Sequence, residues 1–179
     1  MATFIMNPDS TTLISFTASD GGTASYTYVD DDDTSEYLYA TVNGRRIIVG
    51  LEAPSVAEAD IDMSAGITVT LKFKGQKTLF GFGSIIAQQV GTSADGSSIS
   101  NGTDTISMPS SWEIKSGTAE TTSDGTNAWV YGDLSGLALR INQNGSLRAG
   151  QNQIAYMYAE VDYTPAAADN NAIFFGSNF

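Results

Sequence analysis

The residues with the clearest potential for chemistry are four consecutive aspartates in the segment YVDDDDTSEYLY, residues 28–39. Hard cations prefer several carboxylate oxygens, so a calcium loop is one hypothesis. However, the spaced D-x-D-x-D-G pattern of such a loop is absent, and consecutive side chains of an extended backbone point in opposite directions. The sequence favours a solvated loop between two strands. It leaves open whether a cation binds to Asp30, Asp31, Asp32 and Asp33.

Four other carboxylates could supply an acid–base pair: Glu113, Glu120, Glu160 and Asp162. Such chemistry needs two carboxyl groups facing each other across a cleft. Glu160 and Asp162 share one face of a predicted strand, about 7 Å apart, but alternating polar positions are also what an ordinary sheet presents to water. The chain has no histidine, no cysteine and no G-x-S-x-G motif, which removes an activated serine and a thiolate metal site. We expect no catalytic residue, no metal, no cofactor and no enzymatic activity.

Aromatic side chains form a second group with potential for binding. Three tyrosine pairs have the i, i+2 spacing that puts both rings on one face of a strand: Tyr26 and Tyr28, Tyr37 and Tyr39, and Tyr156 and Tyr158. Trp112 and Trp129 add bulk. Exposed on a concave sheet, these rings would stack on sugars, as in carbohydrate-binding sandwiches. If the rings are buried, they form part of the core or of a contact surface between subunits. We favour these two interpretations over a sugar-binding surface.

Composition limits the possible partners. The 179 residues carry 20 acidic and 8 basic side chains, a formal net charge of −12. Such a surface repels phosphate backbones and anionic lipids, so we expect neither nucleic acid nor membrane as a partner. No apolar run approaches the roughly 20 residues of a membrane helix. The opening MATFIMNPDS lacks the pattern of a secretion signal.

Alternation of apolar and polar residues predicts the fold. The clearest strand is GITVTLKFKG (66–75), in which Ile67, Val69, Leu71 and Phe73 form the buried face. Further strands are predicted at 13–18, 24–29, 36–42, 45–53, 78–90, 111–117, 127–132, 133–143 and 153–165. Glycines 81 and 83 suggest a bulge, Asn43-Gly44 a hairpin turn, and residues 54–64 one short helical turn. Segments 91–104, 116–127 and 142–152 are predicted loops.

These strands predict an all-β fold: a two-sheet antiparallel sandwich, jelly-roll-like, at residues 1–164, with a short extended C-terminal tail at 165–179. In the last strand, the pattern puts Ala155 on the core face and Ile154 on the outer face. The tail carries Ile173, Phe174, Phe175 and Phe179, apolar anchors that would either dock on a neighbouring subunit or fold back on their own sandwich. With Tyr156 and Tyr158 they are the candidate interface residues.

The order of strand types resembles a family of jelly-roll domains in tailed-bacteriophage structural proteins. The resemblance lies in DDDDTSEYLYA, RRIIVGLEAPS, AGITVTLKFKG, GDLSGLALRI and YMYAEVDYT, and covers roughly residues 26–164. It implies a virion protein made in the host cytoplasm, forming a homo-oligomer, with a trimer favoured. Its partners would be the major capsid protein or other virion proteins. The resemblance brings no catalytic residue.

The sequence therefore favours a phage capsid decoration or cement protein that binds neighbouring virion subunits. A tail or tail-fibre component is the first alternative, and a carbohydrate-binding β-sandwich module is the second.

Overall fold

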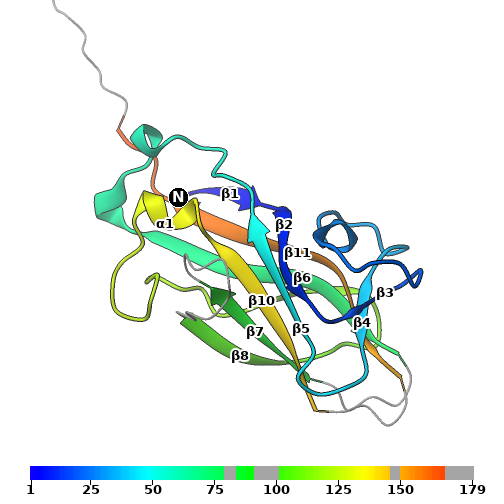
Figure 1. Ribbon diagram of the computed structural model, residues 1–179. Helices are drawn as coiled ribbons and strands as arrows, with labels where there is room; N and C mark the ends of the chain where they lie inside the picture. The colour runs from blue at the N-terminus through cyan, green and yellow to red at the C-terminus, as the bar shows by residue number, and fades with distance from the viewer. Residues whose placement is uncertain (79–83, 91–100, 146–149, 168–179) are drawn as a thin grey trace, which may run out of the picture.

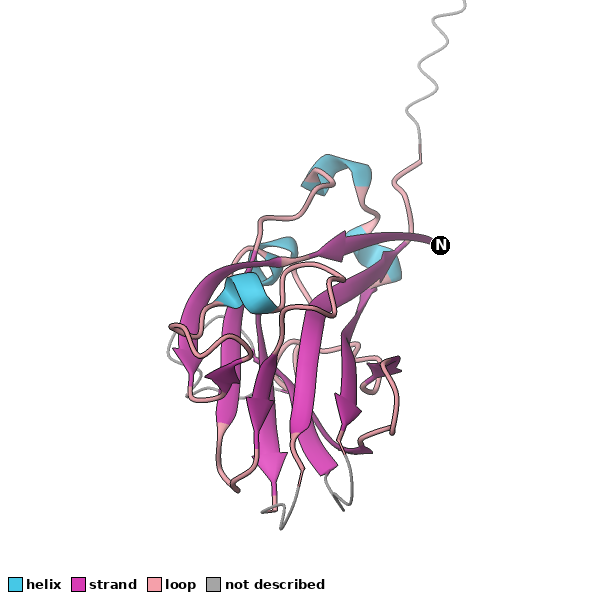
Figure 2. Ribbon diagram, turned by 90° about the vertical axis from the view of Figure 1, so that its right-hand side faces the viewer, coloured by secondary structure: helices cyan, strands magenta, loops and turns pink. Residues whose placement is uncertain are grey.

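The computed structural model describes residues 1–78, 84–90, 101–145 and 150–167, with residues 84–90 and 101–103 described by their backbone alone. Two antiparallel sheets face each other across one hydrophobic core (Figure 1). Figure 2 shows the two layers after a quarter turn. The prediction of an all-β, two-sheet antiparallel sandwich with jelly-roll-like architecture is confirmed.

Sheet A has the order β3-β4-β11-β6-β9, and β1 pairs with the far part of β11. Its strands are β1 (Ala2–Met6), β3 (Thr17–Ala18), β4 (Leu38–Ala40), β6 (Ile67–Lys77), β9 (Glu113–Ser116) and β11 (Asn152–Tyr163). Sheet B has the order β2-β5-β10-β7-β8. Its strands are β2 (Pro8–Ile14), β5 (Arg46–Leu51), β7 (Ser84–Val90), β8 (Asn101–Ser107) and β10 (Ala138–Asn144).

The long ladder between β6 and β11 forms the middle of sheet A and runs from the pair Ile67–Tyr163 to the pair Lys77–Asn152. The predicted inner face of β6 is confirmed, because its four apolar side chains, Ile67, Val69, Leu71 and Phe73, are at most 2% exposed. Removing each of these side chains from water stabilises the fold by about 1.5–3 kcal/mol. In β6, the alternation of apolar and polar residues in the sequence therefore predicted correctly which side chains are buried.

A β-bulge at Ala155 changes the alternation of β11. The pairing runs from Ile154–Gly75 to Tyr156–Lys74, so Ala155 is the extra residue in the ladder. The predicted outward position of Ile154 is therefore wrong: Ile154 is fully buried in the core cluster. After the bulge, Met157, Ala159 and Val161 point inward as predicted.

Two predicted strands are short helices instead. Residues 24–29 contain the 3-10 helix η1 (Tyr26–Tyr28), because the Ser25 hydroxyl accepts a hydrogen bond from the Thr27 amide and so caps a turn. Residues 127–132 run into the helix α1 (Tyr131–Leu134), where the Asp133 carboxylate accepts a hydrogen bond from the Val130 amide. Local side chain to backbone bonds outweigh the β-propensity of these tyrosine-rich and valine-containing segments.

The predicted hairpin at Asn43-Gly44 is also wrong. Gly44 takes the expected positive φ of 81°. However, β4 belongs to sheet A and β5 to sheet B, so the turn carries the chain from one sheet to the other. Most connections in this fold cross between the sheets in this way, which local sequence patterns do not reveal.

Several other elements differ from the prediction. The strand β1 was not predicted, and the strand predicted at 13–18 is divided between the last two residues of β2 and the strand β3. The strand β8 occupies residues 101–107, partly inside a predicted loop. The predicted helical turn at 54–64 is two 3-10 helices, η2 (Glu58–Asp60) and η3 (Met63–Ala65). The predicted bulge at glycines 81 and 83 lies outside the described residues. The tail is described only to residue 167, and Pro165 there forms a bridge with Ile61.

Gly75 offers a test of core packing. An added Cβ would lie 2.7 Å from Met108 Cε and 3.0 Å from the Gln153 carbonyl oxygen, which is backbone and cannot rotate away. We expect Gly75→Ala to lower the free energy of unfolding by about 1–3 kcal/mol in urea denaturation. Gly132→Ala is the matched control, because nothing lies within 4 Å of its Cβ position and its φ is not positive. An equal effect of both substitutions would contradict this packing.

Candidate functional site

The outer face of sheet A carries most of the aromatic side chains singled out in the sequence. Tyr39 on β4 pairs with Gln153 on β11, which pairs with Gln76 on β6, so these three residues form a row across the sheet. Tyr156 and Tyr158 follow on β11 beyond the bulge, opposite Lys74 and Lys72. The prediction that Tyr37 and Tyr39 share one face of the sheet, and that Tyr156 and Tyr158 do so too, is confirmed.

Three rings meet at one end of this face, and we call them the aromatic cluster: Tyr37, Tyr39 and Trp112. The ring centroid of Tyr37 lies 6.4 Å from that of Tyr39 and 5.8 Å from that of Trp112. Tyr37 precedes β4 and Trp112 precedes β9, and these strands are separated in the sheet by β11 and β6. The side chains therefore reach toward each other over the two central strands.

Amides form the floor beside the cluster. Gln76 Nε2 donates a hydrogen bond to Gln153 Oε1 at 2.6 Å, and Gln153 is only 4% exposed although it lies on the outer face. The three rings are partly exposed. Among the described residues, neither the Tyr37 nor the Tyr39 hydroxyl nor the Trp112 indole N–H has a hydrogen-bond partner. The cluster thus combines apolar ring faces with free donors and acceptors, which the sequence did not reveal because Trp112 is distant along the chain.

Tyr156 and Tyr158 contact each other and other residues of the same chain. Their rings stack with centroids 4.7 Å apart, and Tyr158 is only 7% exposed. The Tyr156 hydroxyl donates to Asn7 Oδ1 at 2.8 Å, and burial raises the pKa of both tyrosines. A role for these two residues in a subunit interface stays a prediction.

The tetra-aspartate segment lies between η1 and β4 as a bent loop with three of its four residues exposed. Each carboxylate has a different environment: Asp32 forms an ion pair with Lys74 at 2.8 Å, and Asp31 accepts a hydrogen bond from the Asp33 amide. The Ser35 amide donates to Asp33 and lowers the pKa of that carboxyl group. Burial, and then the charge of Asp31, raises the pKa of Asp30.

The four candidate acid–base carboxylates also have separate environments. Glu160 forms an ion pair with Lys72, Asp162 accepts a hydrogen bond from the Thr3 hydroxyl, and Glu113 forms an ion pair with Lys115. Burial, and then the charge of Asp104, raises the pKa of Glu120. In the described part of the chain, no group of three acidic side chains has the geometry to hold a metal ion.

The remaining aromatic candidates are not on this face. Trp129 is 2% exposed and lies in the core, which confirms the favoured interpretation for this ring, and its indole N–H donates to the Glu120 carbonyl oxygen, so Trp129 is not available to stack on a sugar. The Tyr28 hydroxyl donates to Asp20, and Tyr26 and Tyr28 pack against the core from η1. The predicted interface residues Ile173, Phe174, Phe175 and Phe179 lie outside the described residues.

No protein-family model matches the chain. No curated protein sequence matches it. No helix in the described ranges is long and apolar enough to cross a membrane.

Solved structures with a similar shape include the CBM36-1 domain of a multidomain xylanase from the hindgut metagenome of Trinervitermes trinervoides. The chain is 8% identical to it, with 91% of this chain and 98% of that chain covered and a TM-score of 0.44. The family 11 carbohydrate-binding module of the cellulase Lic26A-Cel5E of Clostridium thermocellum is 10% identical, with 88% and 85% covered and a TM-score of 0.35. The isomalto-dextranase of Arthrobacter globiformis T6 is 12% identical, and the match covers 89% of this chain but 23% of that chain, with a TM-score of 0.42.

The four carboxylates of the tetra-aspartate segment have different environments, and this leads to a prediction about calcium. We expect millimolar CaCl2 to leave the thermal midpoint of the chain at the value measured in KCl of equal ionic strength, because no group of carboxylates among the described residues is arranged around one ion. Differential scanning fluorimetry with and without a chelator measures this. A midpoint that rises only with calcium, and no longer rises in Asp31→Asn, would contradict the expectation.

Proposed function

We propose that the protein is a carbohydrate-binding β-sandwich and that the aromatic cluster of Tyr37, Tyr39 and Trp112 is its sugar platform. The observation that carries the proposal is the combination of three partly exposed rings with polar tips that have no partner among the described residues. Ring faces suit the apolar C–H face of a pyranose, and the hydroxyl and indole groups suit its hydroxyls.

The charges near the cluster favour a neutral sugar. Lys72 and Lys74 are the basic side chains on the outer face of β6, and both form ion pairs with acidic partners, Glu160 and Asp32. A uronic acid or sulfated sugar would have to compete with these carboxylates for the two lysines. It would also approach a chain with a formal net charge of −12. A neutral glycan neither competes for these lysines nor is repelled by the negative net charge.

A virion structural role, as capsid decoration or as a tail or tail-fibre component, is the second candidate. The segments whose residue types resemble those of phage jelly-roll proteins contain the strands β4, β5, β6, β10 and β11. This role supposes a homo-oligomer, with a trimer favoured, that attaches to capsid or other virion proteins in the particle. Its support is the resemblance in strand order, whereas the glycan proposal is supported by the geometry of specific side chains.

Binding of neutral oligosaccharides tests the first proposal. In calorimetric titrations with soluble glucan, xylan, mannan and galactan oligomers, we expect at least one to bind, and Trp112→Ala to weaken that binding about tenfold or more, since an aromatic contact of about 1.4 kcal/mol corresponds to that factor. Tyr39→Phe should weaken it less, because the ring stays and only the hydroxyl is lost.

Tyr28→Phe is the matched control, because it also removes one tyrosine hydroxyl, at a position hydrogen-bonded to Asp20. It should leave binding unchanged. The proposal fails if no neutral oligomer binds, or if Trp112→Ala binds as tightly as the original chain while giving the same thermal midpoint.

Removal of residues 170–179 tests the second candidate. This deletion takes away Ile173, Phe174, Phe175 and Phe179, so a chain held in a trimer by its tail should sediment as a folded monomer after the deletion. Analytical ultracentrifugation of both chains measures this. A monomer before and after the deletion would contradict the docking of the tail on a neighbouring copy.

A further inference from the structure

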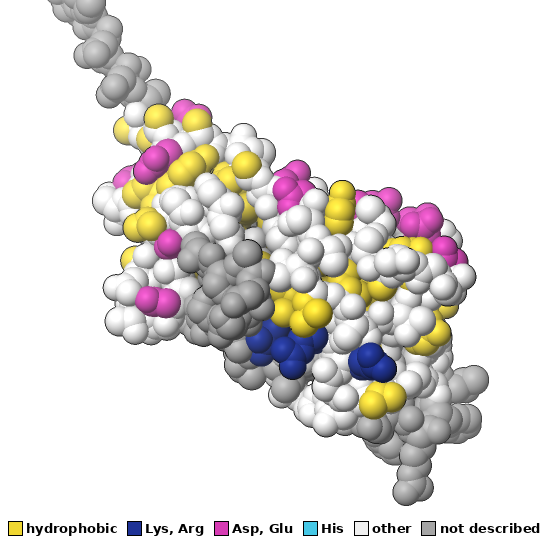
Figure 3. All heavy atoms as spheres, viewed as in Figure 1, with side chains coloured by type: hydrophobic (Ala, Val, Ile, Leu, Met, Phe, Trp, Pro, Cys, Tyr) yellow, Lys and Arg dark blue, Asp and Glu magenta, His cyan; other side chains and the backbone are white. Residues whose placement is uncertain are grey.

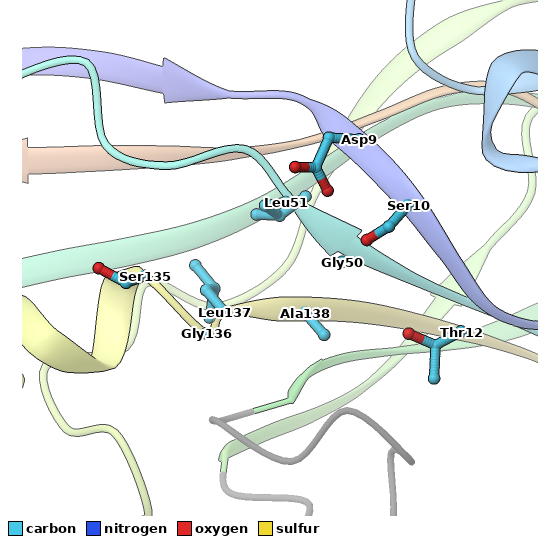
Figure 4. Close-up of a pocket in the computed structure, with 9 residues that line it drawn as sticks. All are labelled: Asp9, Ser10, Thr12, Gly50, Leu51, Ser135, Gly136, Leu137 and Ala138. Carbon is cyan, nitrogen blue, oxygen red and sulfur yellow. The ribbon is translucent and has the colours of Figure 1, made fainter.

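A hollow of about 300 Å³ lies on sheet B, the other sheet of the sandwich (Figure 4). Three neighbouring strands and the turn after α1 form it. Its lining residues are Asp9, Ser10, Thr12, Gly50, Leu51, Ser135, Gly136, Leu137 and Ala138. The volume is at the lower end of the range of pockets that hold small ligands.

Small residues on β5 and β10 create the hollow. Gly50 pairs with Ser10 on one side and with Ala138 on the other, so the central row has no side chain larger than a methyl group beside the serine. A Cβ added at Gly50 would collide with Ser10 Oγ. Leu51 and Leu137 border the end of this row, but their side chains belong to the core cluster and are only 6% and 1% exposed, so they offer little apolar surface to a ligand.

Polar groups stand around this row. Figure 4 shows the Asp9 carboxylate beside Leu51, with the Ser10 hydroxyl next to it and the Ser135 hydroxyl toward the other end. Within the described residues, the side chains of Asp9, Ser10 and Ser135 make no hydrogen bond or ion pair with the protein. A carboxylate can accept hydrogen bonds from two neighbouring hydroxyls of one ligand, and each serine hydroxyl both donates and accepts.

The lining also limits the class of ligand. It contains no lysine, arginine or aromatic residue. An anionic ligand would therefore meet only the negative charge of Asp9, and a flat aromatic ligand would find no ring on which to stack. Basic side chains do occur on the face seen in Figure 3, where they lie in two separate patches. Arg46 and Arg140, which lie close enough to interact electrostatically, do not line the hollow.

We propose that this hollow binds a single neutral sugar unit, which lies over the row of Gly50 and Ala138 with the exposed side chains of Asp9, Ser10 and Ser135 on its hydroxyls. The site belongs to sheet B, whereas the aromatic cluster belongs to sheet A, so the two can be tested separately. This inference therefore stands even if the aromatic cluster binds no glycan.

Amide chemical shifts of the full isotope-labelled chain provide the test. D-glucose, D-galactose, D-mannose and D-xylose are titrated separately into high-millimolar concentration, because a single sugar unit in a small hollow binds weakly. We expect at least one sugar to move the amide signals of Ser10, Gly50 and Gly136 in a saturable way. Asp9→Ala should weaken that binding about tenfold or more, since hydrogen bonds to a charged group are lost.

Two further variants separate the possible results. Ala138→Leu should abolish the shifts by filling the hollow while the spectrum of the remaining amides shows a folded chain, and Trp112→Ala should leave them intact. The proposal is overturned if no sugar moves these signals, if Asp9→Ala binds as tightly as the original chain, or if ethylammonium chloride saturates the site and the sugars do not. Loss of the shifts in Trp112→Ala would assign them to the aromatic cluster and would also overturn it.

Discussion

The antiparallel pairing of β6 with β11 is the interaction on which both faces of sheet A depend. Side chains of a strand alternate between faces, so a slip of one residue in this ladder would exchange the core and the outer face. The bulge at Ala155 makes such an exchange locally: Ile154 enters the core, and Gln153 faces outward to bond with Gln76. Without the bulge, the floor of the aromatic cluster and the stack of Tyr156 on Tyr158 could not both lie on the outer face.

The fold was predictable where burial alone determines the structure. The inner face of β6 could be read from the sequence, because every second residue from Ile67 to Phe73 is a large aliphatic or aromatic side chain. Prediction failed where one local hydrogen bond decides the backbone, as at Ser25, which caps η1, and at Asp133, whose carboxylate accepts a hydrogen bond from the Val130 amide at the start of α1. It also failed at Asn43-Gly44, because sheet membership depends on distant pairing partners rather than on the turn itself.

The candidate sites were less predictable than the fold. The spacing of Tyr37 and Tyr39 showed that they share a face, but their contact with Trp112 depends on the order of strands in the sheet. No sequence pattern distinguished Trp112 from Trp129, although Trp112 is partly exposed and Trp129 lies in the core. The hollow on sheet B lies partly on the part of β2 before residue 13, which was not predicted, and its floor depends on the small residues Gly50 and Ala138 meeting across two strands.

The distribution of exposed apolar side chains bears on the choice between ligand binding and subunit contact. A stable protein interface has an apolar centre formed by neighbouring side chains, typically within about 800 Å² on each partner. Among the described residues, the large exposed apolar side chains other than Met1 are dispersed: Ile5 on β1, Leu13 on β2, Val42 between β4 and β5, Ile114 on β9 and Val130 before α1. Ile5 and Ile114 lie at opposite edges of sheet A, and Leu13 belongs to the other sheet. Single exposed apolar residues are normal on a protein surface. The described exposed apolar side chains therefore do not form the apolar centre of a large interface, and the proposed sugar sites do not depend on one.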